Sequence, residues 1–287
     1  MRVRASGDSV LEALDQWTLS IGNGVTTNGS VLIPEEILTD ITPNTLTEGW
    51  HEADSMKKFC QLVFTNLEEN INTPGWLEGR SILTPTNKEV DAINDMMQDW
   101  VPGDGIKLSS ADSLENPQDA FRFNTEYLNT LRPNGFPQHI LTLKPGMPLM
   151  LLRNINPREG LCNGTRLIFD KSIDNKMLQC RIVGSNRVVL IPRITFIPKP
   201  ADYPFPWQRR QFPVRPSFAT KINKSQGQSL RYVGVWLRGQ VFGHGQLYVA
   251  CSRVSAPSHL KFAVMLDPGL HNKLAARNIV FNEVLLP

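Results

Sequence analysis

The sequence predicts an α/β fold that carries a β-rich insert. In the first third of the chain, a short apolar run is followed by a polar turn and an amphipathic helix, which together make one α/β unit. After residue 140 the pattern changes to five short strand-like runs separated by Gly, Asn and Pro, as in a small barrel or sheet. More strand candidates follow the insert, so we expect the α/β part to resume after it.

Two helices are predicted before the first strand. The first spans 9–19, where the apolar side chains fall on one helical face and a Gly-rich stop follows. The second spans 55–67, with Phe59, Leu62 and Val63 expected to face inward. Each helix therefore has one apolar face to pack against a sheet.

The α/β unit begins with a strand at 81–83, which ends in the polar turn 84–87. The next helix carries apolar residues at helical spacing, namely Val90, Ile93, Met97 and Trp100. From 103 to 136 the sequence is polar and aperiodic, which predicts loops and short irregular elements.

Eight strands are predicted in the rest of the chain. Five form the insert, at 141–144, 148–153, 165–169, 177–183 and 187–191, and three follow it, at 218–219, 232–237 and 261–265. The expected domains are 1–106, the start of the α/β domain with its preceding helices; 107–212, the irregular connection and the insert; and 213–287, the remainder of the α/β domain.

Composition places the chain among ordinary globular proteins. Of its 287 residues 41% are hydrophobic and 20% charged, with 21 Pro and 20 Gly, which excludes a disordered, collagen-like or disulfide-scaffold protein. No apolar run approaches the ~18 residues of a membrane span, and Met1-Arg2-Val3-Arg4 does not open a secretory signal. We therefore expect an intracellular protein without membrane contact. The four cysteines include no C-x-x-C pair, so reduced thiols and no metal site are expected.

The net charge of +3 conceals a split between two parts of the chain. Residues 1–180 carry 15 Lys and Arg against 24 Asp and Glu, a net −9, whereas 181–287 carry 15 against 3, a net +12. One stretch sets nine basic residues against the single acid Asp202: Arg181, Arg187, Arg193, Lys199, Arg209, Arg210, Arg215, Lys221 and Lys224. This density indicates phosphate or nucleic-acid contact, although a solvated basic face has the same composition.

Three polar segments lie where α/β proteins place ligand groups. The turn 84–87 brings hydroxyls and an amide to a helix N-terminus, which suits an anion but equally suits an ordinary N-cap. Segment 220–229 holds two lysines, an amide, a hydroxyl and a glycine that can engage phosphates, or it is a surface loop. Segment 242–254 delivers a Ser-Arg pair after an apolar stretch, where an arginine is often only a surface residue or an ion-pair partner.

Taken in order, these segments resemble the C-terminal half of the Pif1/Helitron family of superfamily-one DNA helicases. The matching runs are Leu83 to Asn87, Leu161 to Leu167 (Leu-Cys-Asn-Gly-Thr-Arg-Leu), Phe218 to Leu230, and His244 to Val254 (His-Gly-Gln-Leu-Tyr-Val-Ala-Cys-Ser-Arg-Val). The resemblance covers nearly the whole chain, and Met1-Arg2-Val3 is similar to the end of the family's first motor domain. It implies a RecA-like second motor domain with a small β-barrel-like insert, the first motor domain being absent.

The resemblance also implies roles for individual residues. Arg253 would be the arginine finger that stabilises charge on the transferred γ-phosphoryl group. The residues implied at the nucleotide are Arg2, Gln226, Gly227 and Tyr248. The residues implied at single-stranded DNA are Thr84, Asn87, Lys221, Asn223, Lys224 and Ser225. ATP and Mg²⁺ are the cofactors implied for the complete enzyme, and single-stranded DNA and the first motor domain are the partners.

Two departures from the family pattern matter. The family's Met-Thr before Ile-Asn-Lys is here Thr220-Lys221, so an ammonium replaces a hydroxyl. The sequence also contains no Gly-Lys dipeptide, hence no G-x-x-x-x-G-K-[ST] loop, and no apolar strand that ends in Asp-Glu to hold magnesium. We therefore predict that no residues of this chain alone bind the cofactors and that this chain alone does not hydrolyse ATP.

Three functions remain open from the sequence. The first is part of an ATP-dependent, 5′ to 3′ DNA helicase acting in replication, repair, recombination, telomere maintenance or Helitron transposition, in the nucleus or the mitochondrion. The second is a non-enzymatic module that binds single-stranded DNA and derives from a helicase. The third is a partner whose Arg253 completes the ATP site of another protein.

Overall fold

The computed structural model describes residues 9–26, 29–39, 41, 52–116, 118, 121–254, 256–264, 275–281 and 283. The chain forms two compact units, one made of Met1–Asn70, Gly79–Met97 and Phe218–Pro287, the other of Ile71–Glu78 and Gln98–Ser217. Each unit is built on its own sheets and its own buried clusters, which are described in turn below.

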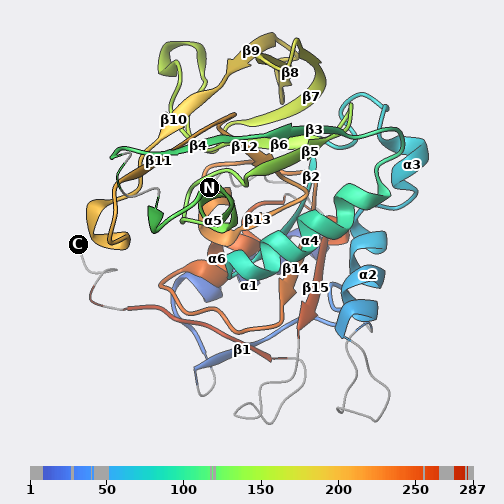
Figure 1. Ribbon diagram of the computed structural model, residues 1–287. Helices are drawn as coiled ribbons and strands as arrows, with labels where there is room; N and C mark the ends of the chain where they lie inside the picture. The colour runs from blue at the N-terminus through green and yellow to red at the C-terminus, as the bar shows by residue number, and fades with distance from the viewer. Residues whose placement is uncertain are drawn as a thin grey trace. The chain divides into compact units, whose positions relative to one another are not determined.

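A four-stranded parallel sheet is the centre of the first unit, in the order β13 (Ala219–Lys221), β2 (Arg80–Thr84), β14 (Tyr232–Leu237) and β15 (Leu260–Val264). Figure 1 shows β2 beside strands that come from the last quarter of the chain. Residues 233–237 of β14 are buried on both faces, as expected for a parallel sheet that is covered by helices on each side.

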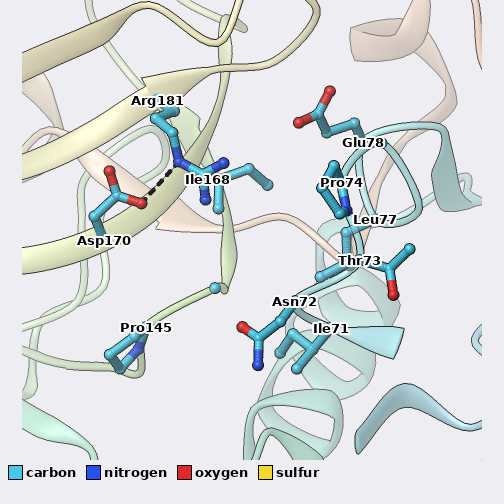
Figure 2. Close-up of a pocket in the computed structure, with 12 residues that line it drawn as sticks. Ile71, Asn72, Thr73, Pro74, Leu77, Glu78, Pro145, Ile168, Asp170 and Arg181 are labelled. Atoms are coloured by element: carbon cyan, nitrogen blue, oxygen red, sulfur yellow. Dashed lines mark hydrogen bonds and ion pairs between the residues drawn. The ribbon is translucent and has the colours of Figure 1, made fainter. Parts of the chain in front are cut away.

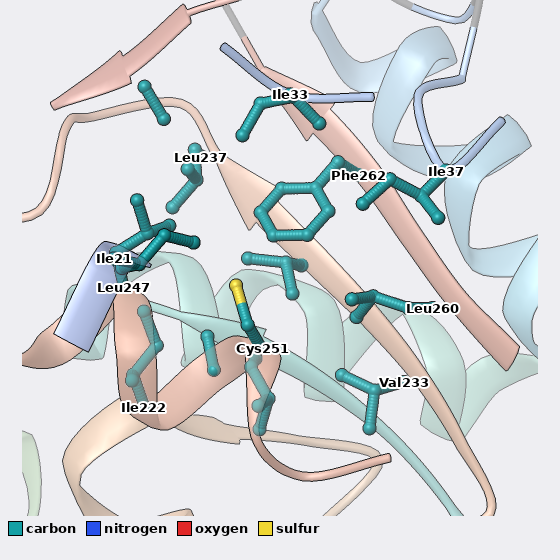
Figure 3. Close-up of a cluster of buried hydrophobic side chains, with 14 of the residues drawn as sticks. Ile21, Ile33, Ile37, Ile222, Val233, Leu237, Leu247, Cys251, Leu260 and Phe262 are labelled. Atoms are coloured by element: carbon teal, nitrogen blue, oxygen red, sulfur yellow. The ribbon is translucent and has the colours of Figure 1, made fainter. Parts of the chain in front are cut away.

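Alternate residues of β14 serve the two faces. Val233, Val235 and Leu237 join a buried cluster with the helices α1 (Ser9–Gly22) and α6 (Gln246–Cys251), part of which is shown in Figure 3. The other face is covered by α2 (Glu52–Val63), whose Phe59 ring lies 5.4 Å from the ring of Trp236. The expected inward positions Phe59 and Val63 are buried, but Leu62 is 36% exposed, so that assignment was wrong.

The remaining elements of this unit flank the sheet. They are α3 (Leu67–Asn70), α4 (Asn87–Trp100), the 3-10 turns η4 (Ile222–Ser225) and η5 (Pro257–His259), and an antiparallel pair of β1 (Ser30–Leu32) with β16 (Ala275–Arg277). The carboxyl ends of parallel strands meet at one edge, so the segments that follow β2 and β13 lie at the same edge of the sheet.

The second unit is antiparallel. Its largest sheet has the order β12 (Val214–Pro216), β6 (Pro148–Leu151), β7 (Arg166–Ile173), β8 (Met177–Ile182) and β9 (Val188–Pro192). A second sheet joins β10 (Ile194–Phe196), β11 (Trp207–Gln211) and β4 (Ala111–Leu114), and a third joins β3 (Ile106–Ser109) to β5 (Ile140–Leu143). The helix α5 (Thr125–Thr130) and the turns η2 (Pro157–Glu159) and η3 (Pro200–Asp202) complete the unit.

The prediction of an α/β fold is confirmed, and the structure shows that the fold has several sheets. The strand expected at 232–237 has those bounds, and the five insert strands appear within a few residues of their expected places as β5 to β9. The sequence did not reveal α5 or the strands β3 and β4 in the region expected to be irregular, nor β10, β11 and β12.

Candidate functional site

The turn 84–87 is filled by a carboxylate of the chain itself. Oε2 of Glu89, a residue only 5% exposed, accepts hydrogen bonds from the Oγ1 atoms of Thr84 at 2.5 Å and of Thr86 at 2.8 Å. Thr86 and Glu89 form a capping box at the start of α4, with the main-chain N–H of Glu89 donating to Thr86 Oγ1 at 3.4 Å. The N-cap interpretation of this turn therefore describes it better than the anion-site interpretation.

The two residues of this turn that were predicted at DNA have different surroundings. Thr84 is fully buried with its hydroxyl directed to Glu89, so its side chain is not presented to a ligand in this structure. Asn87 is exposed on the first turn of α4. Glu89 was missed by the sequence analysis, although the Thr-x-x-Glu spacing before an apolar run was a readable signal.

The segment that follows β13 lies at the same sheet edge as this turn. Lys221 is the last residue of β13, pairs in register with Thr84 and is half-buried, whereas Thr220 is 4% exposed within the sheet. The ammonium that replaces the family's hydroxyl is therefore on the accessible side of the strand end.

Within the next residues, Asn223, Lys224, Gln226 and Gly227 are exposed. Ser225 is fully buried and its Oγ donates to the main-chain oxygen of Ile222 at 2.7 Å, which closes the turn η4. Of the four DNA residues predicted in segment 221–225, three are thus accessible and Ser225 shapes the backbone.

Arg253 ties this turn to the segment that contains α6. Its Nη1 donates to the main-chain oxygens of Gln228 at 2.9 Å and Ser225 at 3.3 Å. Its Nε donates to the main-chain oxygen of Val249 at 2.8 Å, and Nη2 donates to Ser252 Oγ at 2.7 Å. The structure therefore joins the two segments that the sequence analysis selected, 220–229 and 242–254, through the predicted arginine finger.

The electrostatics of Arg253 follow from its half-buried position. Loss of hydration lowers the pKa of its guanidinium, while nearby Tyr248 opposes that shift. A guanidinium stays charged at neutral pH, and the main-chain oxygens around it compensate for the lost water.

Tyr248 packs against the end of α1. A methyl group on Gly22 would lie 2.9 Å from the Tyr248 ring, so the ring lies directly over the glycine. This contact leaves Tyr248 half-buried beside the α6 segment. Arg2, the fourth residue predicted at the nucleotide, lies outside the described residues.

A further residue joins α6 to η4 and was not predicted. Gln246 is 2% exposed, its Oε1 accepts from the main-chain N–H groups of Phe242 at 3.0 Å and Gly243 at 3.1 Å, and its Nε2 donates to Asn223 Oδ1 at 3.0 Å. A glutamine at the start of an apolar stretch gives no signal of burial, so only the structure identifies it.

The nine basic residues between positions 181 and 224 are divided between the two units. Lys221 and Lys224 belong to the first unit and the other seven residues to the second. Arg209 is fully buried with Asp112, Arg193 lies over the Phe212 ring at 4.4 Å and donates to Gln211, and Arg181 pairs with Asp170. For Arg209 the interpretation as a phosphate contact was wrong, because its charge is compensated inside the protein.

The second unit contains a pocket of about 200 Å³ (Figure 2). It lies between the segment 71–78 and residues of β7 and β8, and the charged residues in its wall are Glu78, Asp170 and Arg181. Arg181 already pairs with Asp170 at 2.9 Å, so this wall does not favour a phosphate. No described group of three His, Cys, Asp or Glu residues is placed to hold a metal ion, and no described helix is long and apolar enough to cross a membrane.

Comparison with known proteins gives one consistent family. Residues 126–170 match the model of the DNA helicase Pif1 2B domain. The ATP-dependent DNA helicase PIF1 of Rattus norvegicus is 30% identical over 231 residues, which are 75% of this chain and 34% of that relative. The chain thus spans about a third of the length of this curated relative.

Two solved structures show the shared fold. The Pif1 helicase from Candida albicans is 20% identical with a TM-score of 0.57, over 97% of this chain and 57% of that one. The Pif1 helicase from Bacteroides in complex with ADP-AlF3 and single-stranded DNA is 15% identical with a TM-score of 0.55, over 93% and 52%. By sequence and by fold, the chain is therefore related to the Pif1-type helicases of superfamily one.

Proposed function

We propose that the chain is the RecA-like second motor domain, with its β-barrel-like insert, of an ATP-dependent DNA helicase that moves 5′ to 3′. The observation that carries the proposal is the bond between the two family segments, Arg253 to the main-chain oxygens of Ser225 and Gln228. The relatives are ATP-dependent DNA helicases, and one solved relative holds single-stranded DNA. Replication, repair, recombination, telomere maintenance and Helitron transposition are the processes in which such an enzyme would act, in the nucleus or the mitochondrion.

The proposed DNA contacts are the accessible side chains at the carboxyl edge of the parallel sheet. Asn87, Lys221, Asn223 and Lys224 would bind the phosphate backbone, by charge and by amide donors that read no base sequence. Thr84 and Ser225 would stabilise the backbone beneath these side chains without contacting DNA, because both are fully buried.

The proposed nucleotide contacts are Gln226, Gly227, Arg2 and Tyr248, with Arg253 as the arginine finger. The residues present do not by themselves fit ATP and Mg²⁺, since the sequence has no Gly-Lys dipeptide for a phosphate-binding loop and the described residues offer no metal site. We therefore expect the phosphate loop and the magnesium ligands to come from another domain, and expect this chain alone not to hydrolyse ATP.

Two measurements on the purified chain test the proposal. Binding of a fluorescent oligothymidine, followed by anisotropy, should weaken steeply with salt, and Lys224→Gln should reduce the slope of log K against log salt by about 0.7, the value for one phosphate on a single strand. Lys57→Gln, which removes another exposed lysine from α2, should leave the slope unchanged. Absence of binding at about 50 mM salt would contradict the proposal, because phosphate contacts are strongest at low salt.

An ATPase assay with single-stranded DNA tests the catalytic part. No turnover is expected from the chain alone, and turnover that Arg253→Ala abolishes would contradict that expectation. A non-enzymatic module for single-stranded DNA is the second candidate, favoured by the missing phosphate loop. It would be supported if the chain binds DNA tightly and neither ATP nor an added first motor domain changes the affinity.

A further inference from the structure

A chain of amide contacts leads from fixed main-chain groups to the proposed DNA surface. The N–H groups of Phe242 and Gly243 can only donate, so the Gln246 side-chain atom that faces them at 3.0 and 3.1 Å must be the oxygen. The Gln246 NH₂ group then faces Asn223, and the atom that accepts from it at 3.0 Å must be Asn223 Oδ1. Both amide orientations therefore follow from the backbone.

This order of contacts has a consequence at the surface. With Oδ1 of Asn223 held by Gln246, the Asn223 NH₂ group is directed away from Gln246 on a residue that is exposed. The next residue, Lys224, is an exposed ammonium, so an amide donor and a positive charge are adjacent in sequence on η4. Such a pair suits an oxyanion and would be far less suitable if the amide presented its oxygen.

We propose that Gln246 is a positioning residue that holds the Asn223 amide with its NH₂ group toward a DNA phosphate. The inference rests on the proposed function, since it takes the surface of η4 as a DNA contact. Gln246 itself, at 2% exposure, does not touch the ligand and acts through Asn223. Its place at the start of α6, the helix that leads to Arg253, makes the DNA-facing amide dependent on the segment that carries the predicted arginine finger.

The variant Gln246→Glu tests this directly. The carboxylate still accepts from the N–H groups of Phe242 and Gly243, but it has no donor for Asn223 Oδ1, so the Asn223 amide should turn and donate its NH₂ inward. The oxygen then faces the phosphate, and the affinity for a fluorescent oligothymidine should fall about tenfold or more, as for the loss of a hydrogen bond to a charged group. The control Gln240→Glu adds the same charge in the loop that precedes α6 and keeps the acceptor used by the Arg277 N–H, so its affinity should change little.

A double substitution separates positioning from general damage. Asn223→Ala should lower the affinity to a similar degree, and Gln246→Glu in the Asn223→Ala background should lower it only by the small amount seen for Gln240→Glu. If Gln246→Glu costs the same with or without Asn223, or if Gln246→Glu binds like the wild-type chain, the inference is overturned. If the wild-type chain does not bind at all, the proposed function is overturned together with it, and the two failures are thereby distinguished.

If Gln246→Glu does not fold, the orientation of the Asn223 amide can still be tested on the wild-type chain. In a nitrogen-edited NMR spectrum of the wild-type chain, the Gln246 NH₂ signals should exchange slowly with water and the Asn223 NH₂ signals quickly, the latter being assigned by their loss in Asn223→Asp. Oligothymidine should shift the Asn223 signals. A protected Asn223 NH₂ group that DNA does not shift would contradict the proposed orientation.

Discussion

Arg209 and Asp112 form an ion pair in which both side chains are fully buried. The guanidinium donates to the carboxylate from Nε and from Nη2, the latter at 2.6 Å, and its other N–H groups reach the main-chain oxygens of Leu128, Leu131 and Pro137. All five N–H groups thus have acceptors. Because Leu128 lies in α5 and Leu131 caps its end, the pair fastens this short helix to the sheet of β10, β11 and β4.

Asp112→Asn should destabilise the chain by about 3 to 5 kcal/mol, because it leaves the guanidinium buried without its counter-charge. Urea unfolding followed by tryptophan fluorescence measures this, since Trp207 lies on the same strand as Arg209. Arg210→Gln on the neighbouring exposed position is the control and should change the free energy of unfolding by no more than about 0.5 kcal/mol. Equal changes in the free energy of unfolding for the two substitutions would contradict a stabilising role of the buried counter-charge.

The same pair explains why part of the fold was hidden in the sequence. In β11 the buried positions are Trp207, Arg209 and Gln211, so the alternation of a strand is present but two of its inward residues are polar. A pattern based on hydrophobicity reads this as a basic loop. The helix α5 was missed for a related reason, since its one buried residue, Leu128, gives no helical periodicity.

The central strand of the parallel sheet was predictable, because strands buried on both faces are continuous apolar runs. The strand 232–237 is apolar on both faces and was placed with its observed bounds. The polar segments 84–87, 220–229 and 242–254 were also found from the sequence, because each follows a predicted strand. The hydrogen bonds within and between these segments were not predicted. The burial of Gln246 depends on Asn223, a partner distant in sequence, and composition does not show that. The burial of Glu89 was signalled by the local Thr-x-x-Glu spacing but was not recognised.

Gly234 allows α2 to approach β14. A Cβ atom at this position would lie 2.4 Å from Val63 Cγ2 and 2.9 Å from a ring carbon of Phe59, both in the core of the first unit. Gly234→Ala should therefore destabilise the chain by about 1 to 3 kcal/mol through overpacking. Gly239→Ala is the matched control, because nothing lies within 4 Å of its Cβ. Thermal unfolding should separate the two variants by several degrees, and equal midpoints would refute the close approach.

The four free cysteines should react at two very different rates. Burial raises the pKa of the Cys60 and Cys251 thiols and raises that of Cys180 from its ordinary 9.0 to about 12, so at pH 8 very little thiolate is present at these sites. Cys162 is half-buried in a turn and should react first with a disulfide reagent that releases a coloured thiolate. Cys162→Ser should abolish the fast phase, and urea should bring the remaining three thiols to the fast rate. A second fast thiol in the native wild-type chain would contradict this.

Glu89 already occupies the helix N-terminus at which the sequence suggested an anion. Glu89→Ala should cost about 1 to 3 kcal/mol, because it leaves the buried Thr84 hydroxyl without its acceptor and removes half of the capping box. The substitution also exposes the N–H groups at the start of α4, a 14-residue helix, to solvent anions. Low-millimolar phosphate at constant ionic strength should therefore raise the unfolding temperature of Glu89→Ala by more than that of the wild-type chain. Equal responses would contradict the interpretation that this carboxylate keeps anions away from the helix N-terminus.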